Sequence, residues 1–258
     1  MKLRRIFRIT LSFLTINLLF FLGLLIFPSW LYGYETDLGQ VQVYHQKPLP
    51  GGFEEVVKES LAIIKKSELY TPAFYSELCL NDGSLYPKLV KATLGDDVFR
   101  AFAQKAVMLG EFSADSRSIQ AWGRELSTVQ FLSHAFVHNL QYEYHGVLGA
   151  NPLGRHPEWK WEGYAEYIVL GRGQSLDYYL DLLKRESGPF DWLDLDGGLS
   201  TIRMHLEFMV LAKYCFEQKG WSYKELMKDN TSREQLTREM EQWYKGFREG
   251  VGMLSHGH

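Results

Sequence analysis

The chain has few cysteines, no repeats and no excess of positive charge. Its 258 residues include 2 Cys, and 28 Lys and Arg stand against 31 Asp and Glu. Four of the basic residues lie within the first eight positions, so the rest of the chain is acidic and offers no basic stripe for nucleic acid. The two cysteines, Cys79 and Cys215, lack the spacing of a zinc-ligand pair. These absences argue against nucleic-acid binding and against a cysteine-based zinc site.

Whether the two cysteines pair stays open at the level of the sequence. A location outside the cell would permit a disulfide between Cys79 and Cys215. Cys215, however, lies on the apolar stripe of a predicted helix, and Cys79 lies in an apolar, strand-like run. Two buried free thiols are therefore the other outcome that the sequence allows.

Long apolar runs are absent except at the N-terminus. The 19 residues from Ile9 to Phe27 carry no charge and follow the four basic residues of the first eight positions. As a helix this run spans about 28 Å, which is enough for the hydrocarbon core of a bilayer. Because positive flanks stay in the cytoplasm, we expect a single-pass protein of the cell membrane with a cytoplasmic N-terminus and an extracytoplasmic domain.

A cleaved signal peptide is the alternative for this segment. The apolar core of a signal peptide is usually about 7–15 residues long and ends at a site with small residues. The run here is longer, and the sequence from Pro28 to Tyr34 offers no such site. We therefore expect residues 1–34 to form a basic cytoplasmic tail and a transmembrane anchor, and residues 35–258 to form the domain outside the membrane.

Glycine and proline are absent from Glu125 to Tyr144, where apolar residues recur at three- and four-residue spacing. This pattern predicts an α-helix. His134 and His138 lie one turn apart on one side of that helix. Two imidazoles so placed can both reach one Zn²⁺ at about 2.0–2.1 Å. Half-buried histidines without a metal show the same spacing, so the pair alone does not establish a metal site.

A loop and a second helical segment follow the histidine helix. Residues 146–157 hold three Gly and two Pro and predict the loop. The sequence Trp-Lys-Trp-Glu-Gly-Tyr-Ala-Glu-Tyr, at residues 159–167, then opens the next helix. Together the two segments resemble the gluzincin metallopeptidases, in which a His-Glu-x-x-His helix is followed, past a loop, by a helix with Glu-Gly-x-Ala-x-Tyr. The resemblance covers roughly residues 100–220.

The resemblance implies a set of zinc ligands and an orienting carboxylate. The ligands are His134, His138 and Glu162, and the cofactor is Zn²⁺. Glu166, one turn beyond Glu162, corresponds to a carboxylate that commonly orients a ligand histidine, since a metal-bound histidine needs a partner for its other ring nitrogen. His205 and Tyr214 are the candidates for stabilising the transition state, and a half-buried structural role is the alternative for His205.

The resemblance also implies an α+β, zincin-like domain with two lobes. A small sheet and the active-site helix come first, and a mostly helical lobe follows. The sequence pattern predicts strands at Val41–Tyr44 and Ala73–Leu80, and a strand at Ala106–Phe112 just before the histidine helix. Zincins place an edge strand there, which binds an extended peptide through main-chain hydrogen bonds. Helices are predicted at Phe53–Glu68, Glu125–Tyr144, from Trp159 onward, Leu176–Arg185, Thr201–Glu217 and Arg233–Glu249.

The position after His134 departs from the gluzincin pattern. The family has a glutamate there, which takes a proton from the zinc-bound water, whereas this chain has Ala135. Gln141 is not a base, and His145 would lie about 16 Å along the helix axis from His134. Losing acid–base catalysis typically costs about 10²–10⁴-fold. We therefore expect hydrolysis to be weak or lost, and Ala135→Glu, at a helix position that we expect to be exposed, to raise it.

Two hypotheses on function follow from the sequence. In the first, the chain is a membrane-anchored, extracytoplasmic, zinc-binding metallopeptidase-like protein that acts on peptides or proteins. In the second, it is a metal-free, anchored pseudopeptidase that binds a protein or peptide. The metal content of the purified protein distinguishes them.

Overall fold

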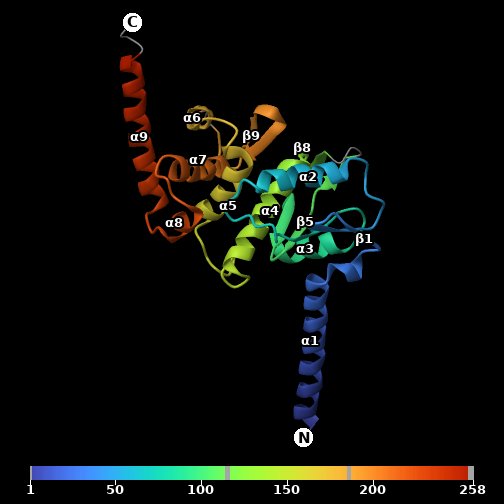
Figure 1. Cartoon of the computed structure of the whole chain (residues 1–258). Helices are drawn as coiled ribbons and strands as arrows, with labels where there is room; N and C mark the ends of the chain where they lie inside the picture. Colours follow the sequence, from blue (N-terminus) through green and yellow to red (C-terminus); the bar gives the residue numbers. More distant parts are fainter. Residues whose placement is uncertain (1, 114–116, 185–186, 255–258) are drawn as a thin grey trace. The chain divides into compact units, whose positions relative to one another are not determined.

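The computed structural model describes residues 2–113, 117–184 and 187–254 and has a mixed α+β fold (Figure 1). Most of the strands lie in the first half of the chain and the second half is mostly helical, so the predicted α+β class is confirmed. The chain forms two compact units. Unit 1 comprises Met1–Leu61 and Thr71–Glu143, and unit 2 comprises Ala62–Tyr70 and Tyr144–His258.

Unit 1 begins with helix α1, Lys2–Ile26, followed by a short 3-10 turn at Pro28–Leu31. Large apolar side chains of α1 are exposed, among them Phe13 at 66% and Ile16 at 65%. Within the part of the chain whose side chains the structure describes, no helix is long and apolar enough to cross a membrane.

A five-stranded sheet forms the core of unit 1, in the order β1-β2-β3-β5-β4. The central strands β2, β3 and β5 are parallel, and the outer strands β1 and β4 pair antiparallel. The strands are β1 Tyr34–Asp37, β2 Val41–His45, β3 Ser76–Cys79, β4 Phe99–Phe102 and β5 Lys105–Met108. The predicted strand at Val41–Tyr44 is confirmed. The one predicted at Ala73–Leu80 is shorter, because the Phe74 N–H closes a turn on the Thr71 carbonyl.

Helices α2, Phe53–Ile64, and α3, Tyr86–Leu94, also begin in unit 1. The prediction that the first of these continues to Glu68 is wrong. The N–H groups of Lys66 and Ser67 donate to carbonyls three residues back, which tightens the end of the helix into a turn.

A second, three-stranded antiparallel sheet follows, in the order β6-β7-β8. Its strands are β6 Glu111–Phe112, β7 Ser118–Ala121 and β8 Arg124–Ser127. The predicted single strand at Ala106–Phe112 is therefore wrong. Strand β5 lies inside the first sheet, between β3 and β4, whereas β6 lies at an edge of the second sheet. The break falls at Gly110, where a Cβ atom would lie 2.5 Å from Ile119 Cγ2, so only glycine lets the chain pass β7 this closely.

Helix α4, Thr128–His145, carries the two predicted histidine ligands. It begins three residues later than predicted, because residues 124–127 pair with β7 as strand β8. The buried Asn139 fixes this helix against the first sheet. Its amide donates to the carbonyls of Ala103 and Lys105, each at 3.0 Å, and its oxygen accepts from Ser76 Oγ at 2.7 Å. The neighbouring His138 is thereby held in a defined position.

The described residues of unit 2 are mostly helical and include one two-stranded hairpin. The predicted helix Leu176–Arg185 ends at Leu183, and Arg185 lies outside the described residues. The helix predicted to begin at Thr201 begins at Arg203 instead, because Thr201 pairs with Leu193 in the hairpin. The elements are α5 Glu158–Glu166, a π-helical turn at Tyr167–Gly171, α6 Leu176–Leu183, β9 Trp192–Leu195, β10 Leu199–Ile202, α7 Arg203–Glu217, α8 Tyr223–Lys228 and α9 Arg233–Leu254.

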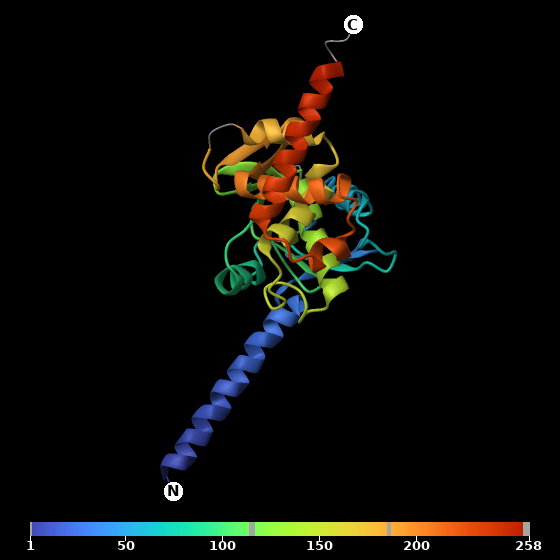
Figure 2. The ribbon, with the colours of Figure 1, turned by 90° about the vertical axis from the view of Figure 1, so that its left-hand side faces the viewer.

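Helices α5 and α7 pack side by side within unit 2 (Figure 2). Gly163 makes this close packing possible. A Cβ atom at this position would lie 2.6 Å from the Phe208 carbonyl oxygen, closer than real Cβ atoms come. The absence of a side chain at Gly163, the residue after Glu162, therefore lets α5 pack directly against α7.

Candidate metal centre

His134 and His138 lie one turn apart on α4, and their Nε2 atoms are 2.9 Å apart. The two rings are 4.6 Å apart between centroids and inclined by 76°. Two ligand nitrogens on a tetrahedral zinc ion, each at about 2.0–2.1 Å, lie about 3.3 Å apart. A small side-chain adjustment thus lets both rings share one ion. The same separation also allows one ring to donate a hydrogen bond to the other.

Gln141 orients His138 from the next turn of α4. His138 Nδ1 donates to Gln141 Oε1 at 2.7 Å, and Gln141 is fully buried. Because a proton on Nδ1 leaves the lone pair on Nε2, this contact prepares His138 to bind a metal. The sequence alone suggests Gln141 only as a candidate base, and the contact with His138 is visible only in the structure. The three-residue spacing of Gln141 from His138 is the available signal.

Glu162 lies in the middle of α5. His134, His138 and Glu162 each offer one ligand atom, these atoms lie within 4.8 Å of one another, and all three residues are partly buried. Two imidazole nitrogens and one carboxylate oxygen form a ligand set that zinc binds. The donor chemistry of His134, His138 and Glu162 fits the ion, but the two histidines belong to unit 1 and Glu162 to unit 2, so their joint role as ligands stays a prediction.

Glu166 contacts His205 within unit 2. Its Oε1 atom accepts a hydrogen bond from Thr201 Oγ1 at 3.1 Å and lies 3.3 Å from His205 Nδ1. Glu166 is buried, whereas the His205 side chain is 25% exposed. The orientation of a ligand histidine by Glu166 stays a prediction. The contact found here joins two residues that the sequence named for different roles.

Tyr214 lies on α7 nine positions beyond His205, about 13 Å along the helix axis. It is buried, and its ring packs 5.8 Å from that of Trp243. Burial raises the pKa of the Tyr214 phenol. The structure therefore does not bring Tyr214 together with His205, and its role in catalysis stays a prediction.

Ala135 is buried, with 2% of its surface exposed. The expectation of an exposed position was wrong, because α4 is covered around most of its circumference. Leu132, Ser133, Phe136 and Val137, which point in different directions around the helix, are all buried as well. A larger side chain at position 135 must therefore be accommodated inside the protein.

Both cysteines are free and buried, as one of the two alternatives for them required. Burial raises the pKa of the Cys79 thiol well above its usual value and that of the Cys215 thiol to about 12. Burial thus disfavours the thiolate, the form that binds metals and attacks substrates, at both positions.

The described side chains thus define a candidate metal centre in an α+β protein. Comparison with known proteins adds no relationship, because no protein-family model, curated protein or solved structure matches the chain. The function must therefore be inferred from the ligand set His134, His138 and Glu162 and from the residues around it.

The contact between Gln141 and His138 leads to a specific prediction. We expect Gln141→Leu to weaken zinc binding by about 10- to 100-fold, since loss of a partner that orients a ligand typically has this effect. Competition with a chromophoric zinc chelator measures the change. Gln141→Glu, which keeps an acceptor for His138 Nδ1, is the matched control and should retain most of the affinity. Equal affinities for wild type and Gln141→Leu would contradict the role of Gln141.

Proposed function

We propose that this chain is a membrane-anchored, extracytoplasmic zinc-binding protein with a zincin-like fold, related in its chemistry to metallopeptidases and weak or inactive in hydrolysis. The observation that carries the proposal is the group of His134, His138 and Glu162, whose ligand atoms lie within 4.8 Å of one another. Three protein ligands with an open fourth position are typical of catalytic zinc sites, whereas structural sites have four protein ligands.

The residues around the ligands explain why hydrolysis is expected to be weak. Zinc, when bound, would lower the pKa of a bound water to about 7 and polarise a peptide carbonyl. The hydrogen bond from His138 Nδ1 to Gln141 leaves the lone pair of His138 Nε2 available to the metal. The alanine at position 135, however, cannot accept a proton from that water. The chain therefore keeps the residues for holding the metal and lacks the usual proton acceptor.

The outer edge of β6 supports a peptide as the ligand. Strand β6 pairs with β7 on one side only, and Ser113 N donates to the Ser118 carbonyl at 3.0 Å. Since hydrogen-bonded and non-hydrogen-bonded positions alternate in an antiparallel pair, Phe112 points its N–H and C=O away from β7. An extended peptide can pair with these two groups by adding a strand to the sheet.

The purified full-length protein in detergent provides the test of this proposal. About one zinc per chain in elemental analysis supports it. The 2.9 Å separation of the His134 and His138 Nε2 atoms, which also suits a direct hydrogen bond, favours a second candidate, a metal-free pseudopeptidase that binds a protein or peptide. Protein that contains no transition metal after purification without chelators, and takes none up on titration, would support this second candidate.

Helix α1 supports the membrane anchor in the proposal. The uncharged run from Ile9 to Phe27 lies almost entirely within this helix, and Phe13, Leu19 and Phe20 are each more than 60% exposed. Exposing apolar side chains to water costs about 25 cal/mol of free energy for each Å² of apolar surface, and contact with lipid removes this cost.

We expect a reporter fused after Gly33 to appear outside the cell membrane and the full-length chain to resist extraction by alkaline carbonate. The basic N-terminal flank and the uncharged run that follows it are the reason for this orientation. As a control, insertion of two lysines in the middle of the run should release the chain into the extract. A mature N-terminus near Gly33, found in a soluble fraction, would instead indicate a cleaved signal peptide.

A further inference from the structure

Helix α1 ends directly on the core of unit 1. Leu25, in its last turn, packs together with Leu31 and Tyr32 against a cluster of buried side chains. The members of this cluster come from β3, α3, β5 and the residue after β5: Cys79, Tyr86, Val90, Val107 and Leu109. The C-terminal end of α1 and the five-stranded sheet therefore belong to one packed body, with no loose linker between them.

Two hydrogen bonds join the start of α3 to the end of α1. The Tyr86 phenol donates to the Leu25 carbonyl at 2.7 Å. Ser84 Oγ donates to the Leu31 carbonyl at 2.9 Å. Carbonyls in the last turn of a helix have no partner within the helix, so Tyr86 satisfies a group that α1 itself leaves open. Both views of the ribbon show α3 beside the C-terminal end of α1 (Figure 1, Figure 2).

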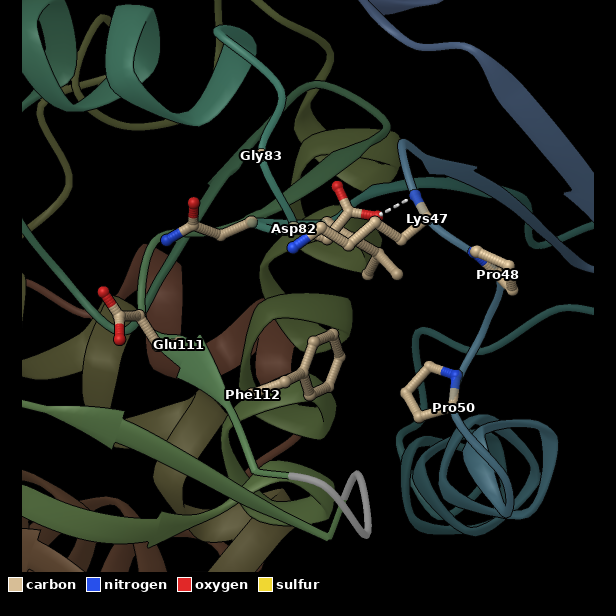
Figure 3. Close-up of a pocket in the computed structure, with 9 residues that line it drawn as sticks. Lys47, Pro48, Pro50, Asp82, Gly83, Glu111 and Phe112 are labelled. Atoms are coloured by element: carbon tan, nitrogen blue, oxygen red, sulfur yellow. Dashed lines mark hydrogen bonds between the residues drawn. The ribbon is translucent and has the colours of Figure 1, made fainter.

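The loop that leads into α3 is held as well. The Tyr32 phenol donates to the Leu80 carbonyl at 2.8 Å. Asp82 Oδ2 accepts from the N–H groups of Gln46 and Lys47, at 2.6 and 2.9 Å, and Figure 3 shows the second of these bonds. The loop is therefore fixed at its beginning, in its middle and at its end, and so is the start of α3.

Leu85 is exposed between the two residues that are bonded to the end of α1. It follows Ser84 and precedes Tyr86 directly, yet 63% of its surface is accessible. Lys88, three residues later, lies on the same side of α3 and is exposed too. An apolar and a basic side chain thus point away from the core beside the place where α1 ends.

Aromatic side chains are exposed at the end of α1. The rings of Phe27 and Trp30 stack with centroids 5.2 Å apart, and Trp30 is 59% exposed. Trp30 Cζ3 lies 3.2 Å from the place that a Cβ atom would take at Gly23, so the indole ring lies back along the helix. Tryptophan is enriched where a membrane protein passes from lipid into water. Lysine suits the same layer, because its stem is apolar and its charged end reaches the water.

We propose that α3 is a second contact with the lipid bilayer, so that unit 1 rests on the membrane surface and does not hang from a flexible tether. The surface that meets the lipid, here called the interfacial surface, consists of Phe27, Trp30, Leu85 and Lys88. This inference rests on the membrane anchor of the proposed function and adds to it a defined lipid-binding surface on the folded domain.

The length of the anchor sets the level of the interfacial surface. Leu18 is the middle residue of the uncharged run from Ile9 to Phe27. At 1.5 Å per residue, the end of the run lies about 14 Å from the bilayer centre, at the edge of a hydrocarbon core about 30 Å thick. Since the start of α3 is hydrogen-bonded to the end of α1, it lies at the same edge. Leu85 enters the hydrocarbon there, and the Lys88 ammonium group reaches the lipid phosphates.

Fluorophores attached to single cysteines of the full-length protein in phospholipid nanodiscs test this placement. Leu85→Cys and Lys88→Cys report on the interfacial surface, and Leu18→Cys reports on the anchor. Glu55→Cys, at an exposed position of α2, is the matched control within unit 1. Lipids that carry a nitroxide at a shallow or a deep position of the acyl chain quench each label according to its depth. Both native cysteines are buried, and labelling of the wild type measures their background.

We expect the Leu18 label at the bilayer centre. The Leu85 and Lys88 labels should lie about 14 to 22 Å from the centre, between the edge of the hydrocarbon and the outer edge of the headgroups. The Glu55 label should be quenched by neither lipid. Circular dichroism verifies that each variant is folded, and the two positions on α3 provide the measurement independently of each other.

The outcomes separate the interfacial surface from the anchor. A Leu18 label at the bilayer centre, with Leu85 and Lys88 labels as unquenched as the Glu55 label, would overturn the interfacial surface and leave the anchor intact. Leu85 and Lys88 labels that are shielded both from the lipid quenchers and from a water-soluble quencher would overturn it too, because a protein would then cover α3. A Leu18 label that the deep nitroxide does not quench would overturn the anchor itself.

Discussion

Replacing either His134 or His138 by alanine is expected to abolish zinc binding. The Nε2 atoms of the two imidazoles lie 2.9 Å apart, close enough to share one ion after a small adjustment, so removing one imidazole leaves at most two of the proposed ligands. Changes that only disturb the orientation of a ligand cost about 10- to 100-fold in affinity, and loss of a ligand should cost more than that. Glu162→Gln should weaken binding without abolishing it, because an amide oxygen is a neutral and poorer ligand. Zinc stoichiometry and affinity by competition titration measure these effects.

Thermal unfolding provides a second measurement that does not depend on activity. Zinc at about 100 times its dissociation constant should raise the unfolding free energy of the wild type by about 2.7 kcal/mol, and this increase should vanish in the two alanine variants. His145→Gln is the matched control, since His145 also lies on α4 but contacts Tyr223 instead of the other two histidines. The ligand assignment would be wrong if both alanine variants bound zinc as tightly as the wild type.

The local features of the candidate site could be predicted from the sequence. Helical periodicity is a property of a short segment, so the positions of His134 and His138 on one side of α4 follow from their spacing alone. Glu162 came from the resemblance of residues 159–167 to a known motif, and the structure places it on a helix as expected. Whether Glu162 shares a metal ion with the two histidines depends on the folded chain, and no periodicity predicts it.

The strands around β6 could not be predicted in the same way. Strands β7 and β8 have four residues each, with a single buried apolar residue apiece, Ile119 and Leu126. A period of two needs a longer run to become visible. The apolar run from Ala106 to Phe112 was therefore interpreted as one strand. The close approach of Ile119 to Gly110, which separates β5 from β6, is a tertiary contact.

Tertiary contacts also explain the errors at the level of single side chains. The exposure of Ala135 depends on which elements cover α4, and the sequence of the helix does not contain that information. The contact between Glu166 and His205 likewise depends on the packing of α5 against α7, which Gly163 permits. The sequence could name these residues as candidates, but their partners required the structure.

Ala135→Glu is expected to raise peptidase activity by about 10²–10⁴-fold, the contribution that acid–base catalysis typically makes. The wild type should be slow or inactive on the same unstructured peptides. Since Ala135 is buried, the new carboxylate should lower the unfolding free energy of the metal-free protein by about 1–3 kcal/mol. Bound zinc should reduce that loss, because a nearby cation favours the charged form of a carboxyl group. Peptide cleavage and thermal unfolding, each with and without zinc, measure the two effects.

Ala135→Gln separates the proton acceptor from the size of the new side chain. Glutamine has nearly the volume of glutamate and cannot accept a proton at neutral pH, so this variant should be destabilised to a similar extent and remain inactive. Wild-type turnover at about 1–10³ s⁻¹, abolished by a chelator, would mean that another residue already serves as the base. If a folded, zinc-loaded Ala135→Glu protein were no more active than Ala135→Gln, the missing base would not be the only obstacle to hydrolysis. The protein would then hold zinc without placing a peptide bond beside it, and a non-catalytic, peptide-binding role would be favoured.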